Sequence, residues 1–304
     1  MASVIHVESL RKHYGRVRAV DDVSFDVTEG EIFGLIGPNG AGKTTTLECV
    51  EGLRMPDAGR IRLFGLDPVR DAKALQMRVG VQLQESHLQK RITVWEAVDL
   101  WASLYGQTVD PRRLLEQLGL HEKRQAWFMT LSGGQKQRLF IALALIHDPE
   151  VVFLDELTTG LDPQARRAIW DLVRGIRARG KTVVLTTHLM EEAERLCDRV
   201  AIVDHGRIVD VGTPADLVNR HCPERAVAIT TDDARAADLL GACRSVRRVE
   251  RADRALLAHG DTDALLDDVL ACLTTHGVHV TGMQSRIASL EDVFLRLTGH
   301  SVRS

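Results

Sequence analysis

The sequence EIFGLIGPNGAGKTT, residues 31–45, decides the fold. Its apolar part, residues 32–36, is typical of a buried strand, and residues 37–44 have the spacing of a phosphate-binding P-loop. In such a loop, glycines let backbone N–H groups converge on phosphate oxygens, and the following helix directs its positive end at them. We expect Lys43 to neutralise the β- and γ-phosphates of a nucleotide and the Thr44 hydroxyl to reach a Mg²⁺ ion.

A second apolar strand, residues 151–154, ends in the two carboxylates Asp155 and Glu156. Two acids at a strand end are common in solvated turns. After a P-loop, however, this arrangement is typical of the Walker B segment of a nucleotide hydrolase. We therefore expect Asp155 to lie beside the Mg²⁺ ion and Glu156 to face the attacking water.

Around these segments, short runs rich in Val and Ile alternate with helical periods, which predicts a largely parallel sheet covered by helices. Residues 4–7 and 23–27 alternate in polarity and predict an antiparallel β layer. Residues 93–147 lack strand signals, and Thr93 is a suitable N-cap, so they predict an inserted helical subdomain. The strands expected to be buried on both faces are residues 32–36, 79–83, 151–154, 182–186 and 200–203.

The pattern breaks near residues 219–223, and residues 225–304 predict a second domain. Its elements follow the order βαββαβ with a closing helix over residues 289–298, which is the ferredoxin-like arrangement. The expected fold class is therefore α/β. It comprises a P-loop NTPase core with an antiparallel β layer and a helical subdomain over residues 1–222, followed by a small α+β domain.

Composition is that of an ordinary folded protein: of 304 residues, 44% are hydrophobic and 27% are charged. The formal net charge is -3, so the chain lacks the excess of basic residues that is typical of nucleic-acid-binding proteins, and we expect no nucleic-acid partner. The longest apolar run, residues 139–146, is far shorter than the ~18 residues that span a bilayer as a helix. Residues 1–10 lack the layout of a signal peptide. We expect a cytoplasmic protein that needs a partner chain for any membrane role.

The cysteines form no C-x-x-C pair, which favours reduced thiols packed as small apolar residues. Cys272, His276 and His279 can also be interpreted as metal ligands, because the first two lie four residues apart on a predicted helix. Gly277 is expected to end that helix, and no fourth ligand is evident, so metal binding is disfavoured. The five cysteines are Cys49, Cys197, Cys222, Cys243 and Cys272.

The run Leu131-Ser-Gly-Gly-Gln135 is the most specific motif in the chain. It is the signature of ABC (ATP-binding cassette) proteins, and residues 4 to about 220 resemble an ABC cassette, with every diagnostic segment in the family's order. Physically, it offers a second set of backbone N–H groups at a helix start, suited to a γ-phosphate. The resemblance implies that the signature of one cassette closes over the nucleotide of a second copy. An ATP-bound homodimer with two composite sites is therefore expected.

The resemblance implies ATP and Mg²⁺ as ligands and assigns most of the site. Residues expected to act on the partner's nucleotide are Ser132, Gly133, Gly134 and Gln135. Residues expected to bind ATP are Tyr14, which stacks on adenine, and Gly37, Pro38, Asn39, Gly40, Ala41, Gly42, Lys43, Thr44 and Thr45.

The remaining site residues also transfer from the resemblance. Gln84 matches the Q-loop glutamine that reaches Mg²⁺ and the water, and Gln82 is a rival for this role. With Thr44 and Asp155, Gln84 completes the expected Mg²⁺ ligands. His188 matches the switch histidine that helps to orient Glu156 and its water.

Two positions lie in the segment after Glu156. Asp162, in Gly-Leu-Asp-Pro, matches the D-loop residue that communicates across the dimer. Leu157 departs from the family, since many members have proline there. A proline fixes φ and a leucine does not, so the change concerns the turn and its coupling rather than the carboxylates.

The closing segment SLEDVFLRLTG, residues 289–299, resembles the tail of bacterial multidrug or antibiotic exporter cassettes, including the daunorubicin-resistance kind. This implies an ATP-hydrolysing subunit on the inner face of the cell membrane that powers a separate permease and exports a drug, antibiotic or other hydrophobic compound. An importer cassette remains the alternative. A non-transport ABC ATPase is disfavoured, because tandem cassettes and long heptad insertions are missing. The apolar residues expected to pack this helix on the second domain's sheet are Leu290, Val293, Phe294 and Leu297.

Overall fold

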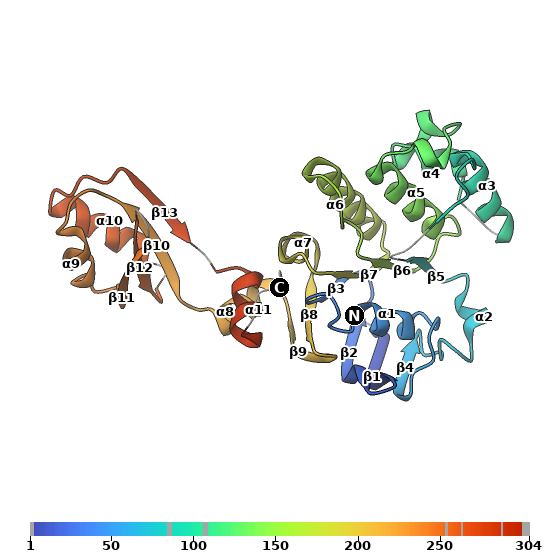
Figure 1. The fold of residues 1–304 in the computed structure, drawn as a ribbon, viewed down its shortest axis with the longest axis horizontal. Helices are drawn as coiled ribbons and strands as arrows, with labels where there is room; N and C mark the ends of the chain where they lie inside the picture. Colours follow the sequence, from blue (N-terminus) through green and yellow to red (C-terminus); the bar gives the residue numbers. More distant parts are fainter. Residues whose placement is uncertain are drawn as a thin grey trace. The chain divides into compact units, whose positions relative to one another are not determined.

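The computed structural model describes residues 3–83, 87–105, 109–252, 255–262, 264–286 and 288–299. They form two compact units, one within residues 1–214 and one over residues 215–299 (Figure 1). The helix α8 (Pro214–His221) lies at the junction. It precedes the boundary expected from the sequence near residue 222, yet all but its first residue belong to the second unit.

The first unit is built on a six-stranded sheet. Its strands are parallel except for the last pair, β8 and β9, which is antiparallel. Every residue of β3, β6 and β7 is buried, and so are residues 200–203 of β8, as predicted. The expectation was wrong for β5, which lies at the edge of the sheet and alternates between half-buried and buried residues. In spatial order the strands are β5 (Val79–Gln82), β6 (Val151–Asp155), β7 (Thr182–Thr187), β3 (Ile32–Ile36), β8 (Arg199–Asp204) and β9 (Arg207–Gly212).

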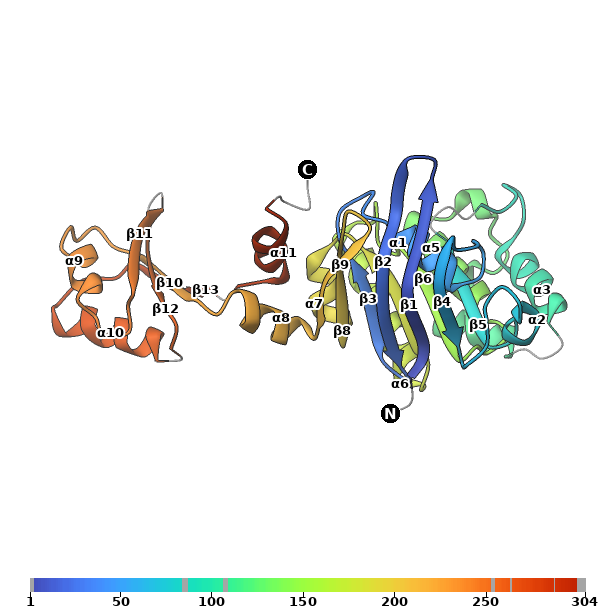
Figure 2. The same ribbon diagram turned by 90° about the horizontal axis from the view of Figure 1, so that it is seen from below.

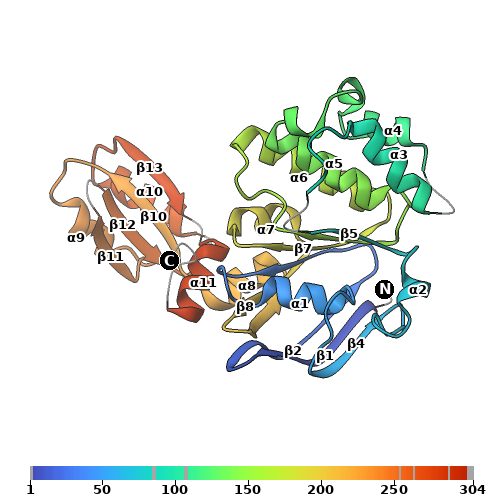
Figure 3. The ribbon, with the colours of Figure 1, turned by 45° about the vertical axis from the view of Figure 1, so that its right-hand side comes forward.

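A three-stranded antiparallel sheet forms a second layer of this unit (Figure 2). Its strands β2 (Val17–Thr28), β1 (Ser3–Tyr14) and β4 (Ala58–Leu63) lie side by side in that order. The helix α1 (Lys43–Val50) lies between the two sheets (Figure 3) and contributes Leu47 and Val50 to their shared core. Because α1 is held from both sides, the loop at its start has a fixed position.

The helical subdomain lies within residues 93–145 and extends from the sheet at β5 and β6 (Figure 1). Thr93 caps α3 through a reciprocal capping box with Glu96. The elements are α3 (Val94–Leu104), α4 (Pro111–Gln117), the 3₁₀ turns His121–Lys123 and Phe128–Thr130, and α5 (Gly133–Leu145). The other helices of the unit are α2 (Ala72–Leu75), α6 (Pro163–Ala178) and α7 (Met190–Leu196).

The second unit contains a four-stranded antiparallel sheet in the order β11-β12-β10-β13. The helices α9 and α10 cover it and share one apolar core with β10 and β12. Both the order of elements and the order of strands are those of a ferredoxin-like domain, as the sequence predicted. The elements are β10 (Arg225–Thr230), α9 (Ala236–Gly241), β11 (Arg248–Ala252), β12 (Ala255–Gly260), α10 (Leu265–Thr275) and β13 (Gly282–Arg286).

The closing helix α11 (Leu290–Thr298) corrects one expectation. Leu290, Val293 and Phe294 are buried, but none of them belongs to the core beneath α9 and α10. All three ribbon views place α11 beside α8 instead (Figures 1 to 3). An amphipathic pattern determines which face of a helix is buried, but not which element covers that face.

No helix in the described part of the chain is both long and apolar enough to cross a membrane.

Candidate functional site

The P-loop conformation depends on glycine at two positions. Gly42 has a φ of +98°, and a Cβ there would lie 2.1 Å from the carbonyl oxygen of Ala19. At Gly37, a Cβ would lie 2.1 Å from the carbonyl oxygen of Val203. There is no room for a side chain at either position, so both must be glycine. With glycine there, the backbone can turn between β3 and α1 and present its N–H groups.

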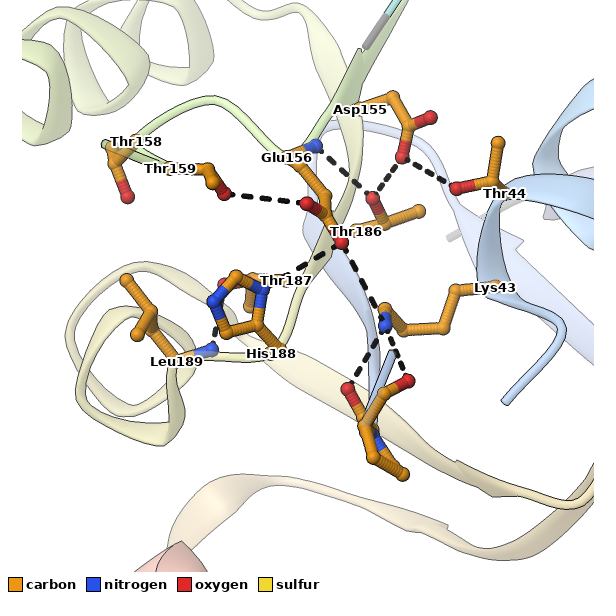
Figure 4. A network of polar contacts seen from close by, with 12 residues as sticks. Lys43, Thr44, Asp155, Glu156, Thr158, Thr159, Thr186, Thr187, His188 and Leu189 are labelled. Carbon is orange, nitrogen blue, oxygen red and sulfur yellow. Dashed lines mark hydrogen bonds and ion pairs between the residues drawn. The ribbon is translucent and has the colours of Figure 1, made fainter. Parts of the chain in front are cut away.

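Lys43 is the first residue of α1, and its side chain is buried. Its Nζ donates to the carbonyl oxygens of Gly37 and Pro38, each at 2.9 Å, and lies 3.9 Å from Oε1 of Glu156 (Figure 4). Burial lowers the pKa of Lys43, and the negative charges of Glu156 and Asp155 oppose this shift. The ammonium group therefore lies where the loop, the helix start and two carboxylates meet.

Asp155 ends β6 and faces two hydroxyl groups. The Oγ1 of Thr44 donates to Asp155 Oδ1 at 3.3 Å, and the Oγ1 of Thr186 donates to the same oxygen. Burial raises the pKa of Asp155, and these hydrogen bonds oppose the shift. One carboxylate and one hydroxyl oxygen next to a phosphate loop match the oxygen ligands that Mg²⁺ prefers.

Glu156 follows in a left-handed conformation, with a φ of +47°. Its backbone N–H donates to Oγ1 of Thr186 at 3.1 Å, and its Oε2 accepts a hydrogen bond from Thr159 Oγ1 at 3.3 Å. His188 Nδ1 lies 3.6 Å from Oε1, which is longer than a hydrogen bond. Figure 4 shows the carboxylate between Lys43 and His188. This places an acid, a histidine and a lysine around one small space.

A cavity of about 220 Å³ opens at this point. The signature residues 132–135 are not among the described residues that line it. Its lining combines the loop backbone, the start of α1 and one carboxylate, a combination that fits the phosphates of a nucleotide. The lining residues are Ala19, Asn39, Gly40, Gly42, Lys43, Thr44, Thr45 and Glu156.

The signature segment begins α5. Ser132 is its N-cap: its Oγ accepts from Gln135 N at 3.3 Å, while Gln135 Oε1 accepts from Ser132 N at 2.9 Å. Added Cβ atoms would lie 3.3 Å from Leu161 at Gly133 and 3.1 Å from Ala165 at Gly134. The two glycines therefore let the start of α5 approach the start of α6, while Ser132 stays exposed.

Similarity to known proteins decides the family. Residues 20–159 match the family described as "ABC transporter". The whole chain is 43% identical over 306 residues to "Nod factor export ATP-binding protein I" of Ralstonia nicotianae, covering 99% of this chain and 95% of that protein. This chain belongs to the ABC transporter family.

Two further comparisons extend this result. The chain is 34% identical to "Linearmycin resistance ATP-binding protein LnrL" of Bacillus subtilis over 99% of its own length and 100% of the relative. It also resembles a solved ATP-binding subunit of an ABC transporter, with a TM-score of 0.64 and 30% identity over 72% of this chain and 92% of that chain. The protein is thus an ATP-binding cassette of the ATPase type, as its motifs predicted.

Two other expected site residues, Asp162 and Tyr14, are not among the described residues that line the cavity at the P-loop. Asp162 is exposed and caps α6, where its Oδ1 accepts from the N–H groups of Gln164 and Ala165, each at 2.9 Å. Tyr14 is 42% exposed at the end of β1. Its ring lies 5.3 Å from the guanidinium carbon of Arg54. Gln84 lies outside the described residues.

Gln82, the rival of Gln84, is buried in β5. Its Nε2 donates to the carbonyl oxygen of Leu83 at 2.6 Å. The Gln82 side chain is therefore buried and bonded to the backbone of the next residue, and Gln84 remains the prediction for the Q-loop role.

Sequence reasoning gave Thr186 no role, although its hydroxyl contacts both Asp155 and the backbone of Glu156. The contact arises because Asp155 and Thr186 are register partners at the ends of adjacent parallel strands. The one available signal was the Thr-Thr pair directly before His188.

Glu51 ends α1 as its C-cap residue and yields a prediction on stability. Its Oε1 is buried without a hydrogen-bond partner among the described residues. Burial raises the pKa of Glu51 to about 8, and the charge of Asp155 adds to this shift. An acid with a raised folded-state pKa costs stability as the pH rises from its unfolded value to the folded one. The cost is at most about 1.4 kcal/mol per pH unit over that window.

The variant Glu51→Gln cannot ionise, so we expect it to melt several degrees above wild type at pH 9 and close to wild type at pH 5. Thermal unfolding at both pH values measures this. The matched control is Glu29→Gln at an exposed turn. Its melting temperature should stay close to that of wild type at both pH values. Equal gains for Glu51→Gln at both pH values would show that its charge is not the cause.

Proposed function

We propose that this ATPase powers a separate membrane permease and exports a drug, antibiotic or other hydrophobic compound. One observation carries the proposal: the similarity to a Nod factor export protein and a linearmycin resistance protein extends over 99% of the chain, second domain included. General cassette structures match a smaller part, 72% in the case reported above. The features beyond the cassette are therefore shared with relatives named for export and resistance.

The reaction we propose uses two copies of the chain. ATP binds along the P-loop of one copy, where Lys43 neutralises the β- and γ-phosphates and Tyr14 stacks on adenine. The exposed start of α5 in the second copy, at Ser132, closes over the γ-phosphate. Asp162 would transmit the state of one site to the other. Hydrolysis removes the γ-phosphate that joins the two copies, and they separate.

Within each site, Glu156 is the proposed general base for the attacking water. Its position beside Lys43 Nζ and 3.6 Å from His188 supports this role. His188 would orient the carboxylate and its water, together with Gln84. Thr44, Asp155 and Gln84 would hold Mg²⁺, which when bound neutralises the charge that develops on the phosphates.

The permease would bind the cassettes at the inner face of the cell membrane. The work is mechanical: closing and opening of two cassettes moves whatever is attached to them. A chain that couples ATP hydrolysis to export therefore needs a membrane partner that recognises the cargo. The homodimer, the permease and this membrane-peripheral location are parts of one proposal.

Purification of the tagged chain from membranes of its own host, followed by mass spectrometry, tests the proposal. We expect a multi-span membrane protein in stoichiometric amount and no solute-binding protein. A permease together with a solute-binding protein would indicate import instead. Recovery with ribosomes, and without any membrane protein, would contradict a transport role.

The proposed division of labour, with the cassette in residues 1–222 and an accessory domain in residues 225–304, gives a further prediction. Deletion of residues 225–304 should leave ATP affinity within about threefold of wild type, because every contact of the P-loop described above lies before residue 214. Titration with a fluorescent ATP analogue measures the affinity. Loss of binding by soluble, folded truncated protein would show that the second domain takes part in nucleotide binding.

A further inference from the structure

A buried carboxylate, Glu192, lies on α7, the helix that begins two residues after His188. It is 1% exposed. Its Oε1 accepts two hydrogen bonds, from Thr158 Oγ1 at 2.8 Å and from Trp170 Nε1 at 2.8 Å. One oxygen atom thus connects three segments: the turn after β6, the helix α6 and the helix α7.

No described residue forms an ion pair with Glu192, although Arg195 on the same helix lies over the Trp170 ring at 5.4 Å. A carboxylate removed from water without a cation is costly unless hydrogen bonds compensate it. The two donors therefore hold the carboxylate in one place. The carboxylate in turn fixes the donors, because each would otherwise be a buried polar group without an acceptor.

Thr158 lies in the turn that carries Glu156. It is buried, and its carbonyl oxygen accepts from Leu161 N at 3.1 Å, while Thr159 N donates to the Glu156 carbonyl oxygen at 3.4 Å. Glu156 itself has a φ of +47°, a conformation that a non-glycine residue keeps only when its surroundings enforce it. Leu157 supplies no restraint on φ of the kind that a proline would. The hydroxyl of Thr158 is therefore an anchor close to a strained residue.

We propose that Glu192 is a positioning residue that joins the turn carrying Glu156 to the helix following His188, so that the two side chains keep their spacing. The inference rests on the proposed function, which assigns the base and switch roles to these side chains. Glu192 does not touch the nucleotide cavity. It acts through Thr158 on one side and through the start of α7 on the other.

The two donors provide a matched pair of variants. Thr158→Val and Trp170→Phe each remove one hydrogen bond to the same oxygen. Valine keeps the shape of threonine, whereas phenylalanine keeps an aromatic ring but is smaller than the buried tryptophan. Only Thr158 belongs to the turn after Glu156, whereas Trp170 lies in α6. A purely structural role for Glu192 predicts the same behaviour of both variants, but a positioning role predicts different behaviour.

We expect Thr158→Val to lower kcat about tenfold, part of the ~10²-fold loss that a 1 Å misplacement of reacting groups causes. KM for ATP should stay within about twofold, because the P-loop is unchanged. Trp170→Phe should lower the melting temperature at least as much as Thr158→Val, because it also removes buried volume, and should leave kcat near wild type. Steady-state ATPase kinetics and thermal unfolding of the purified full chain measure both properties.

Two variants of Glu192 complete the test. Glu192→Gln retains an oxygen acceptor and should keep most of kcat. Glu192→Ala should lower kcat as Thr158→Val does. The double variant Thr158→Val/Glu192→Ala should be no slower than either single variant, since both substitutions remove the hydrogen bond between Thr158 and Glu192. Glu191→Ala, at an exposed position on the same helix, is the control and should leave kcat unchanged.

Equal kcat in Thr158→Val, Trp170→Phe and wild type would overturn the inference, and so would additive losses in the double variant. Glu156→Gln, measured alongside, separates this result from failure of the proposed function. If Glu156→Gln hydrolyses ATP normally, the assignment of the base is wrong. If Glu156→Gln is inactive while Thr158→Val is normal, only the role of Glu192 is wrong.

Discussion

Purified Lys43→Ala protein is expected to lose both ATP binding and ATP hydrolysis. The side chain supplies the positive charge nearest to the β- and γ-phosphates, in a place where burial strengthens each electrostatic contact. Its Nζ also donates to the carbonyl oxygens of Gly37 and Pro38, so the substitution leaves two loop acceptors without their donor. The lysine is expected to make one charge-assisted contact to the β-phosphate and one to the γ-phosphate. Losing both, at 1.5–3 kcal/mol each, corresponds to at least about a 100-fold loss of ATP affinity.

Isothermal titration with ATP and a phosphate-release assay measure the two losses. Lys73→Ala, at an exposed position on α2, is the control and should bind and hydrolyse ATP as wild type does. Circular dichroism establishes that Lys43→Ala is folded. A folded Lys43→Ala protein with unchanged affinity would contradict the assignment of residues 37–45 as the phosphate loop.

Five of the six strands in the large sheet of the first unit were predictable because they are short and mostly apolar. The edge strand β9 was not predicted, because polar and apolar residues alternate in it. Residues 32–36, 151–154 and 182–186 lie between polar or glycine-rich segments, and burial on both faces removes the need for alternation. The antiparallel layer was predictable for the opposite reason, since residues 4–7 and 23–27 alternate. The position of α11 was not predictable, because a helical pattern carries no information about its partner.

The phosphate loop and the two carboxylates were also predictable, because each of these motifs is contiguous in the chain. The contacts between different motifs were not predictable from the sequence. Thr186 reaches Asp155 only because β6 and β7 pair in register. Glu192 meets Thr158 across 34 residues. Such contacts depend on tertiary packing, and the local sequence of Glu192, in Met-Glu-Glu-Ala, is equally compatible with an exposed helix face.

Glu156→Gln should reduce ATP hydrolysis by about 10²- to 10⁴-fold, the usual contribution of a positioned general base. Glutamine keeps the size and hydrogen-bonding reach of the side chain but loses the charge and the ability to take a proton. The variant should still bind ATP, because Lys43, the loop backbone, Thr44 and Asp155 are unchanged. A wild-type rate of hydrolysis would show that another group acts as the base.

The same variant should accumulate as an ATP-bound dimer, whereas wild type should dimerise only briefly. In the proposed cycle, the γ-phosphate joins Lys43 of one copy to the start of α5 in the other, so blocked hydrolysis keeps the copies together. Size-exclusion chromatography with light scattering, with ATP present, measures the mass. The control Glu156→Gln/Ser132→Arg should bind ATP and stay monomeric, because Ser132 is exposed at the helix start and an arginine there blocks the approach of the partner's nucleotide. A Glu156→Gln protein that binds ATP yet remains monomeric would mean that ATP alone does not close the two cassettes, and that the permease supplies the missing contacts.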